Sequence, residues 1–370
     1  MIYRTIGLMS GSSLDGLDIV FAEFHENGGK WSYEIIEAEC YPYSNEWINK
    51  LKNATLLTPL DYQLLHTEYG HYLGQQVNKF IEGKGLQYKV ALIASHGHTT
   101  FHVPSKMMTA QLGDGAAIAA ETKLPVVSDL RAMDIAFGGQ GAPIVPIGEK
   151  LLLGGYDYFL NIGGIANISI KLHPQPLSKG EGEVGFDVCP ANRVLNILAN
   201  EAGKEYDENG KMASKGNVNK ELLDKLNGLD YYKQPYPKSL ANGFGTDTVY
   251  PLIKNCGCNI PDALRTYVEH ISIQIRNAIE SSRLPAGDCR LFATGGGAFN
   301  NFLIERLKDQ LTELNIEVVI PDEKIIKYKE ALIMGLIGVL RWREKYNTLP
   351  SVTGAIRGSI GGALWLGQEE

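Results

Sequence analysis

The chain carries the same local pattern at two distant places: an apolar strand, a turn of small residues and a second strand. The first copy is Gly7-Leu8-Met9-Ser10-Gly11-Ser12-Ser13-Leu14-Asp15-Gly16-Leu17-Asp18, and the second is Asn161-Ile162-Gly163-Gly164-Ile165-Ala166-Asn167. Taken alone, the first copy is an ordinary β-hairpin with Asp-Gly at its bend. Its recurrence predicts a duplicated α/β fold, because each half then opens with a β-meander that bends at a glycine turn.

Helices and further strands follow each meander. In the first half, strands are expected at residues 3–9, 16–24, 31–40 and 90–94, and in the second half a third strand is expected at 183–187. Helices are expected at 61–82, 191–201 and from about 327 to 345. The segment Gly138-Gly139-Gln140-Gly141-Ala142-Pro143, called the breaker below, is rich in residues that interrupt helices and strands. It is interpreted as a crossover between domains or as the floor of a cleft. The sequence therefore predicts an N-terminal domain over 1–145 and a C-terminal domain over 146–370.

The two turns suit a polyphosphate. Glycine lets the backbone approach a ligand, and serine hydroxyls and free N–H groups can face an anion. Neither turn is a P-loop or a dinucleotide fingerprint, because the Gly-Lys-Ser/Thr and Gly-x-Gly-x-x-Gly patterns are absent. A third cluster, Gly295-Gly296-Gly297, lies between an expected strand and a helix expected from Ala298. There a flat ligand can rest on bare backbone, so the clusters together predict nucleotide binding.

The overall composition limits the partners. A formal net charge of −7 gives no reason to expect nucleic acid or an anionic membrane as a partner. No apolar run approaches the ~20 residues that a membrane span needs, and no signal peptide is expected. The five scattered cysteines are expected to be free thiols, which is typical of a reducing compartment. We therefore expect a cytoplasmic protein.

Further motifs lie along almost the whole chain. They are Ser95-His96-Gly97-His98-Thr99, Gln111-Leu112-Gly113-Asp114, Asp129-Leu130-Arg131, Gly185-Phe186-Asp187, Pro237-Lys238-Ser239 and Leu349-Pro350-Ser351-Val352-Thr353-Gly354-Ala355. Together with the glycine clusters they resemble the anhydro-N-acetylmuramic acid kinase family, within the sugar kinase, Hsp70 and actin superfamily. The resemblance implies a two-domain actin-like ATPase (ribonuclease H-like) fold, with duplicated mixed-sheet domains and a cleft between them.

The resemblance also implies a reaction. An ATP-dependent kinase would open 1,6-anhydro-N-acetylmuramic acid with water and phosphorylate O6, giving N-acetylmuramic acid 6-phosphate and ADP in peptidoglycan recycling. Mg²⁺ would bridge the phosphates, held largely by water and one carboxylate, Asp15 or Asp18. The nucleotide-binding residues would be Gly11, Ser12, Ser13, Leu14, Asp15, Gly16, Leu17, Asp18, Gly163, Gly164, Asn167, Gly295, Gly296 and Gly297.

Asp187 is the predicted catalytic base. From the residues alone, Asp187 reads as the N-cap of the helix expected at 191–201. The resemblance reverses that reading, since the aspartate of the family's Phe-Asp motif is its general base. The chain departs from the family beside it: Val188, Cys189 and Ala191 stand where Thr, Gly and Gly are usual.

Arg131 and Glu330 are the predicted sugar contacts. An Arg fork suits the lactyl carboxylate of muramic acid, although the residues alone favour an ion pair with Asp129 or Asp134. Glu330 lies in the expected first turn of a long helix, where the macrodipole alone would favour it. In the resembling enzymes the matching Glu-Ala pair faces the substrate.

His96, His98 and His102 imitate a metal site, but they lack a convincing further ligand. We therefore predict no protein-bound metal centre and interpret His96 as a polar residue lining the sugar site. Two alternatives stay open: a kinase of the same fold with another sugar, and a chaperone-like or regulatory ATPase. The oligomeric state is left open, with a homodimer as one candidate.

Overall fold

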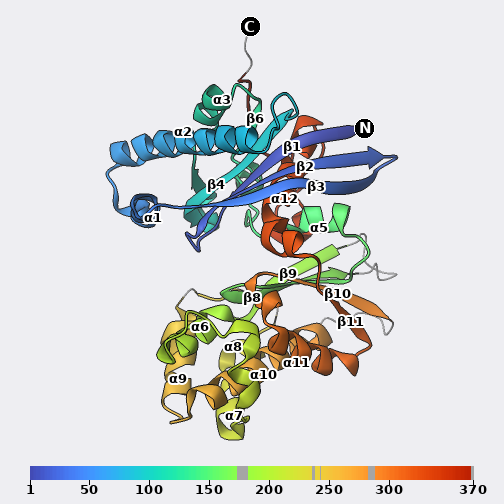
Figure 1. Ribbon diagram of the computed structural model, residues 1–370. Coiled ribbons are helices and arrows are strands. Elements are labelled where there is room, and N and C mark those ends of the chain that lie inside the picture. Colours follow the sequence, from blue (N-terminus) through green and yellow to red (C-terminus); the bar gives the residue numbers. More distant parts are fainter. Residues whose placement is uncertain (173–181, 236–237, 242, 282–287, 368–370) are drawn as a thin grey trace. The chain divides into compact units, whose positions relative to one another are not determined.

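The computed structural model describes residues 1–172, 182–235, 238–241, 243–281 and 288–367 (Figure 1). Pro237 of the Pro-Lys-Ser motif lies outside these ranges. The chain forms two compact units: unit 1 comprises Met1–Gly154 and Tyr328–Glu370, and unit 2 comprises Gly155–Lys327. The sequence expected 146–370 to form one domain, whereas the segment from Tyr328 onward belongs with unit 1.

Unit 1 is built on a mixed sheet with the strand order β12-β6-β4-β1-β2-β3, and β5 pairs with β4. Strand β1 is antiparallel to β2 and parallel to β4, and β4 is parallel to β6. The strands are β1 (Ile2–Ser10), β2 (Gly16–Asn27), β3 (Lys30–Pro42), β4 (Leu92–Val103), β5 (Met108–Leu112), β6 (Val126–Ser128) and β12 (Ala363–Trp365).

Unit 2 repeats this arrangement in the order β9-β8-β7-β10-β11. Here too a meander of three antiparallel strands is followed by two strands parallel to the first. The strands are β7 (Tyr158–Ile162), β8 (Ile165–Leu172), β9 (Gly182–Pro190), β10 (Cys289–Thr294) and β11 (Ile316–Val319). The predicted α/β class with duplicated mixed sheets is confirmed.

Helices cover the sheet of unit 1, and two of them set its core. Helix α2 (Pro59–Gly83) begins after Thr58, whose side chain accepts from the Asp61 amide, and buries an apolar stripe against β1 and β2. Helix α12 (Glu323–Trp342) packs so closely on β1 that a Cβ on Gly7 would overlap the Ala331 carbonyl. This contact explains why the C-terminal segment belongs to unit 1. The other helices are α1 (Asn45–Lys52), α3 (Gly115–Thr122), α4 (Ala132–Ala136), α5 (Pro146–Leu152) and α13 (Pro350–Thr353).

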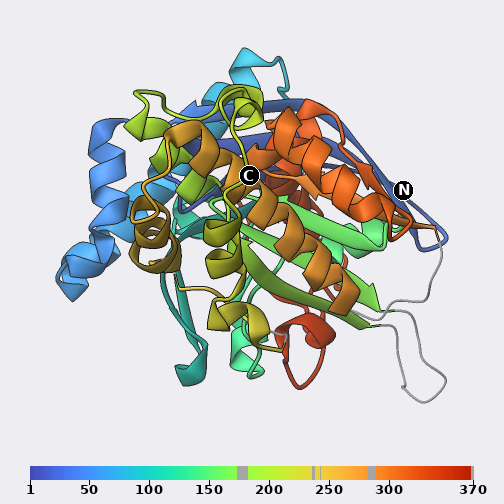
Figure 2. The same ribbon diagram turned by 90° about the horizontal axis from the view of Figure 1, so that it is seen from below.

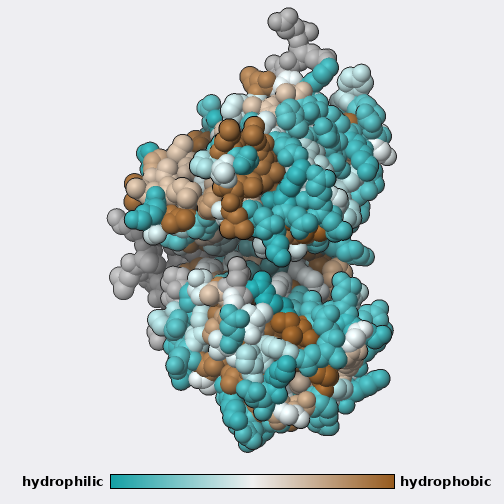
Figure 3. Space-filling model, turned by 90° about the vertical axis from the view of Figure 1, so that its left-hand side faces the viewer, coloured by the Kyte–Doolittle hydropathy of each residue, from teal (hydrophilic) through white to brown (hydrophobic). Residues whose placement is uncertain are grey.

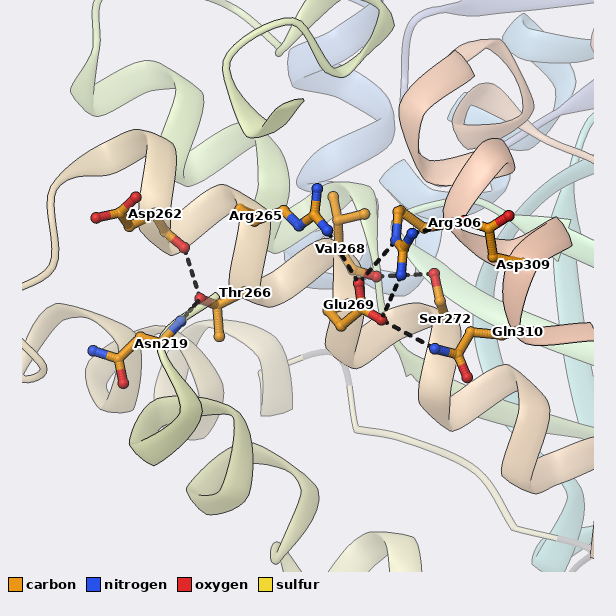
Figure 4. A network of polar contacts seen from close by, with 10 residues as sticks. All are labelled: Asn219, Asp262, Arg265, Thr266, Val268, Glu269, Ser272, Arg306, Asp309 and Gln310. Carbon is orange, nitrogen blue, oxygen red and sulfur yellow. Dashed lines mark hydrogen bonds and ion pairs between the residues drawn. The ribbon is translucent and has the colours of Figure 1, made fainter. Parts of the chain in front are cut away.

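The helices of unit 2 gather on one face of its sheet (Figures 1 and 2). They are α6 (Asn192–Glu201), α7 (Lys220–Asn227), α8 (Asp230–Lys233), α9 (Tyr250–Lys254), α10 (Ile260–Ser281) and α11 (Asn301–Thr312). Buried Glu269 joins α10 to α11, because its carboxylate accepts from Arg306 Nε at 3.0 Å, Arg306 Nη2 at 3.2 Å and Gln310 Nε2 at 3.0 Å (Figure 4). No helix in the described ranges is long and apolar enough to cross a bilayer.

Three local predictions differ from the structure. Strand β4 continues to Val103 and pairs with β5, whereas the sequence ended it at Ala94, because Gly97 takes a positive φ of 70° and lets the strand continue. The helix expected from Ala298 begins instead at Asn301. A 3₁₀ turn, Gly296–Phe299, comes first, and Asn300 then caps the helix. Cys256 and Cys258 form a disulfide across Gly257, where two free thiols were expected.

Candidate active site

The first glycine turn is a wide loop at the end of β1. The last β1–β2 pair is Ser10 with Leu17, so residues 11–16 form the loop, which is longer than a two-residue Asp-Gly bend. Ser12, Ser13 and Asp15 are exposed in it, and Leu14 has a positive φ of 60°. Asp15 Oδ1 accepts from Ser13 Oγ at 2.6 Å and from the Gly16 amide at 3.1 Å. Short polar side chains therefore hold this loop from within.

Below the loop lies a buried hydrogen-bonded chain that the sequence did not reveal. Ser10 Oγ accepts from the Tyr43 hydroxyl at 2.8 Å and lies 3.0 Å from His98 Nδ1. The hydroxyls of Tyr43 and Tyr69 are 2.5 Å apart. Because Tyr43 follows β3, Tyr69 lies in α2 and His98 lies in β4, no local pattern could have indicated these partners. They fix the end of β1 at the root of the loop.

The second glycine turn is tight and is held by backbone. Its last pair is Ile162 with Ala166. The Gly163 carbonyl accepts from the Asn192 amide at 3.0 Å, and the Gly164 carbonyl accepts from the Ala191 amide at 2.8 Å. The first amides of α6 thus find partners in the turn, which fixes its conformation.

Polar residues line up across the same end of the unit 2 sheet. Asn161 of β7 pairs with Asn167 of β8, which pairs with Asp187 of β9. Residues directly opposite each other share a face of a sheet, so these three side chains form one row. Gly295 has a positive φ of 81°, and a Cβ there would overlap the Asn161 side chain. The structure thus brings Asn167, Asp187 and Gly295 together, and adds Asn161, which the sequence analysis had not singled out.

Asp187 does not cap α6. The N-cap of that helix is Ala191, which makes no side-chain hydrogen bond. Instead, Asp187 Oδ2 accepts from the Leu240 amide at 2.8 Å, and the Asp187 amide donates to the Lys238 carbonyl at 3.1 Å. The Tyr231 hydroxyl donates to the Asp187 carbonyl at 2.6 Å. The segment around Lys238 and Leu240 therefore positions the aspartate, and the cap interpretation is excluded.

The chemical state of Asp187 suits a proton acceptor. Burial raises the pKa of this half-buried carboxyl above its ordinary value, and the Leu240 amide opposes that rise. Among the described residues, its Oδ1 has no hydrogen-bond donor, whereas both oxygens of Glu269 in the same unit are engaged by Arg306 or Gln310. A carboxylate with one unengaged oxygen and a raised pKa can take a proton from a nucleophile.

The three residues beside Asp187 that differ from the family pattern are buried in the core. Val188 is 2% exposed, and Cys189 and Ala191 are fully buried in the hydrophobic cluster of unit 2. Their side chains present no surface to a ligand. They act on the site only through the backbone that carries Asp187.

In unit 1, Arg131 is held by neutral groups. Its Nε donates to His96 Nε2 at 2.8 Å, and its Nη1 donates to the Gly141 carbonyl. The expected alternative, an ion pair with Asp129 or Asp134, does not form. Asp129 accepts from Ser128 Oγ at 2.7 Å, and Asp134 accepts from the Gly141 amide at 2.8 Å and Thr353 Oγ1 at 2.8 Å.

Asp134 also explains two glycine- and proline-rich motifs. It ties Gly141 of the 138–143 breaker to Thr353 of the 349–355 motif, and the Gln140 amide donates to the Thr353 carbonyl at 2.7 Å. Asp134 is 1% exposed. The breaker is therefore a fixed support for Arg131 within unit 1. In the sequence, the one signal for this role of Asp134 was an acidic residue at a position of the helical pattern that is expected to be buried.

Glu330 lies beyond the first turn of α12, because the helix begins at Glu323 after the cap Asp322. The macrodipole explanation for Glu330 is therefore wrong. Beside it, Lys329 Nζ and Glu149 Oε1 form a buried ion pair at 2.7 Å, which fastens α12 to α5. Burial raises the pKa of Asp18, a hydrogen bond with Cys40 opposes the rise, and the charges of Asp15 and Glu330 add to it, which gives a net pKa of about 6. Asp15 and Glu330 of unit 1 thus lie within electrostatic range of Asp18.

The three histidines turn to separate partners. His96 Nδ1 lies 2.9 Å from the Gly97 carbonyl, His98 Nδ1 faces Ser10, and His102 Nδ1 lies 3.1 Å from Thr109 Oγ1. In the described part of the chain, no group of three or more His, Cys, Asp or Glu side chains is arranged to hold a metal ion.

Comparisons with known proteins cover nearly the whole chain. A relative described as anhydro-N-acetylmuramic acid kinase from Photobacterium profundum is 33% identical over 375 residues, 96% of each chain. One of the same description from Haemophilus influenzae is 32% identical and covers 95% of this chain and 94% of its own.

Solved structures match more distantly. An activator of 2-hydroxyisocaproyl-CoA dehydratase from Clostridium difficile with bound ADPNP is 13% identical, with a TM-score of 0.44 over 92% of this chain and 96% of its own. A ROK family glucokinase from Streptomyces griseus, in complex with glucose and AMPPNP, is 12% identical, with a TM-score of 0.39 over 91% of this chain and 99% of its own. The model of the anhydro-N-acetylmuramic acid kinase family matches residues 3–367. The chain belongs to the anhydro-N-acetylmuramic acid kinase family.

Proposed function

We propose that this protein is an ATP-dependent kinase that converts 1,6-anhydro-N-acetylmuramic acid into N-acetylmuramic acid 6-phosphate and ADP. The observation that carries the proposal is Asp187, a half-buried carboxylate with one oxygen held by Leu240 and the other without a donor among the described residues. Family membership over residues 3–367 supplies the substrate class. The product would enter peptidoglycan recycling in the cytoplasm, where ATP is available.

Asp187 acts as the general base. It removes a proton from water as the water oxygen bonds to the anomeric carbon and the bond from that carbon to O6 breaks. The released O6 bonds to the γ-phosphorus of ATP, the bond to the β-phosphate oxygen breaks, and ADP leaves. The proton stays on Asp187 until it passes to solvent. One base serves both changes, because the leaving oxygen is also the phosphoryl acceptor.

The glycine clusters bind the nucleotide. The turn from Gly11 to Asp18 and the Gly163-Gly164 turn contact the phosphates, and Asn167 with the 295–297 cluster contacts the remainder of the nucleotide. Neither Gly11 nor Gly164 has a positive φ, and a Cβ on Gly164 would lie no closer than 3.8 Å to its neighbours. Because the fold itself does not require glycine at position 164, the need for open backbone beside a ligand explains it.

Arg131 and Glu330 bind the sugar. The Arg131 fork pairs with the lactyl carboxylate, and Glu330 accepts hydrogen bonds from sugar hydroxyls. Asp15 and Asp18 are hard oxygen donors and fit a Mg²⁺ ion, whose charge would offset the burial that raises the pKa of Asp18 to about 6. When bound, Mg²⁺ would neutralise charge that builds on the phosphates.

A homodimer is the proposed assembly. Leu56, Leu60 and Leu64, at the start of α2 and just before it, are 81%, 69% and 59% exposed, and apolar surface is visible on this face of unit 1 (Figure 3). Exposed apolar patches often mark protein contacts. Light scattering of the wild type and of a Leu60→Lys variant tests this, since the variant should run as a monomer.

ADP release measured with three sugars tests the activity. We expect turnover with 1,6-anhydro-N-acetylmuramic acid and little with N-acetylmuramic acid or glucose, because only the anhydro sugar supplies O6 as a leaving group. Equal turnover with glucose would favour a kinase for another sugar. Release of ADP at one rate with or without sugar would favour a regulatory ATPase.

A further inference from the structure

His96 is buried beside Arg131, and its two ring nitrogens have different partners. The residue is 3% exposed, so a ligand has almost no surface of the ring to touch. Its Nδ1 lies 2.9 Å from the Gly97 carbonyl, and its Nε2 lies 2.8 Å from Arg131 Nε. Both nitrogens are therefore occupied by the protein itself.

These partners define the tautomer. A carbonyl oxygen can only accept, so Nδ1 carries the proton, and a guanidinium can only donate, so Nε2 offers its lone pair. Burial, followed by the Arg131 charge, lowers the pKa of His96 to about 3. The ring is neutral at physiological pH and remains an acceptor for Arg131.

Arg131 keeps its charge in this setting. Its hydrogen bonds end on an imidazole and on the Gly141 carbonyl, both uncharged. Burial lowers the pKa of Arg131 to about 10, and the charges of Glu330 and Asp134 oppose that change, so the guanidinium stays protonated at neutral pH. Within the described residues, its Nη2 makes no hydrogen bond to the protein. The Nε and Nη1 atoms of the Arg131 guanidinium are thus fixed by the protein, and its Nη2 is available to an anion.

We propose that His96 is a positioning residue: it orients Arg131 toward the carboxylate of the sugar and does not itself contact the sugar. This rests on the proposed function and refines the role expected for His96 from the sequence. The imidazole supplies a neutral acceptor that fixes the plane of the guanidinium and leaves its charge intact. A carboxylate at the same place would neutralise that charge. Selectivity for a carboxylate-bearing sugar thus depends on a neutral histidine.

The test compares two anhydro sugars that differ in the carboxylate. Wild type, His96→Leu and His96→Gln are assayed with 1,6-anhydro-N-acetylmuramic acid and with 1,6-anhydro-N-acetylglucosamine, which lacks the lactyl group. His96→Leu should raise KM for the first sugar by about tenfold, with kcat, KM for ATP and KM for the second sugar near wild type. His96→Gln keeps an acceptor toward Arg131 and should recover part of the loss. His71→Leu, which makes the same replacement on α2, is the control.

A double-mutant cycle with Arg131→Ala separates positioning from direct contact. Once Arg131 is gone, His96→Leu should cost nothing further, because its effect passes through the guanidinium. A second, additive loss in the double variant, or equal KM increases for both sugars, would overturn the proposal. If His96→Leu does not fold, the same comparisons made with His96→Gln decide the matter. An Arg131→Ala enzyme that still prefers the carboxylate sugar would instead contradict the sugar-binding role of Arg131 in the proposed function.

Discussion

The two glycine turns occupy equivalent places in two sheets in which five strands share the same order, yet they are held in different ways. In unit 1 the loop from Gly11 to Gly16 is wide, exposed and fastened by the side chains of Ser13 and Asp15. In unit 2 the Gly163-Gly164 turn is tight, and its carbonyls receive the first amides of α6. The same topology thus supports one turn held by side chains and one turn held by backbone.

The charged groups of the two units differ in a similar way. Unit 1 contains Arg131, Glu330, Asp15 and Asp18, and it holds Arg131 through the His96 side chain and the Gly141 carbonyl. Unit 2 offers Asp187, held by the backbone of a segment around Leu240. We infer that unit 1 serves recognition of charged ligands and that unit 2 supplies the base.

The largest effect is expected at the base. Asp187→Asn keeps the shape and the Leu240 contact but cannot accept a proton, so turnover should fall by ~10²–10⁴ while ATP and sugar still bind. Turnover, calorimetric affinities and melting temperature are measured on the same sample. Asp230→Asn, at an exposed carboxylate of the same unit, is the control and should stay near wild type. Near-normal turnover in a folded Asp187→Asn enzyme would contradict the inference that unit 2 supplies the base.

A smaller and more selective effect is expected at Arg131. Arg131→Ala should raise KM for the anhydro sugar by roughly ten- to hundredfold, because a hydrogen-bonded charge contributes ~1.5–3 kcal/mol, and should leave KM for ATP near wild type. Arg276→Ala removes a surface arginine of unit 2 and serves as the control. Equal increases in both KM values would mean that Arg131 supports the fold rather than sugar recognition.

Glycine replacements distinguish structural from functional backbone. A Cβ on Gly297 would overlap the Ile162 side chain, so Gly297→Ala should destabilise the protein by ~1–3 kcal/mol. Gly164 has room for a Cβ, so Gly164→Ala should change stability by less than ~0.5 kcal/mol. ATP affinity should nevertheless fall for Gly164→Ala. Denaturant unfolding and calorimetry measure both, and unchanged ATP affinity in Gly164→Ala would leave the tight turn without a ligand role.

The smallest effect is expected in the pH dependence of stability. The pKa of Asp18 rises on folding from 3.8 to about 6, so the folded state binds the proton more tightly. The Asp18 carboxyl therefore makes the free energy of unfolding fall as the pH rises from about 4 to about 6. Asp18→Asn should flatten the fall and stabilise the metal-free protein at pH 7, as thermal melts in a chelator would reveal. Added Mg²⁺ should raise the melting temperature of the wild type more than that of the variant.

Strand alternation and helical periodicity were sufficient to predict the elements around both turns. The strands expected at 3–9, 16–24 and 31–40 and the helix expected at 61–82 are confirmed with small shifts. Their patterns reflect burial on one face, which is a local property of the sequence. The end of β4 was misjudged because the positive φ of Gly97 permits a continuation that composition does not reveal.

Long-range partners could not be predicted. Asp187 and Leu240 are 53 residues apart, so sequence alone favoured a helix cap that the structure excludes. Asp134 and Thr353 are separated by 219 residues, and the contacts of α12 with unit 1, at Gly7 and at Glu149, join segments far apart in the chain. Such contacts depend on the topology of the sheet, which a single sequence does not encode locally.

The route of the water oxygen tests the central claim most directly. The reaction is run in ¹⁸O-labelled water with ATP and 1,6-anhydro-N-acetylmuramic acid, and the products are examined promptly by mass spectrometry. If Asp187 directs water to the anomeric carbon and O6 takes the phosphoryl group, as we propose, the sugar phosphate should carry one ¹⁸O on the sugar and none on the phosphate. Label in inorganic phosphate, with the anhydro sugar left intact, would mean that water attacks ATP, and it would contradict the kinase account.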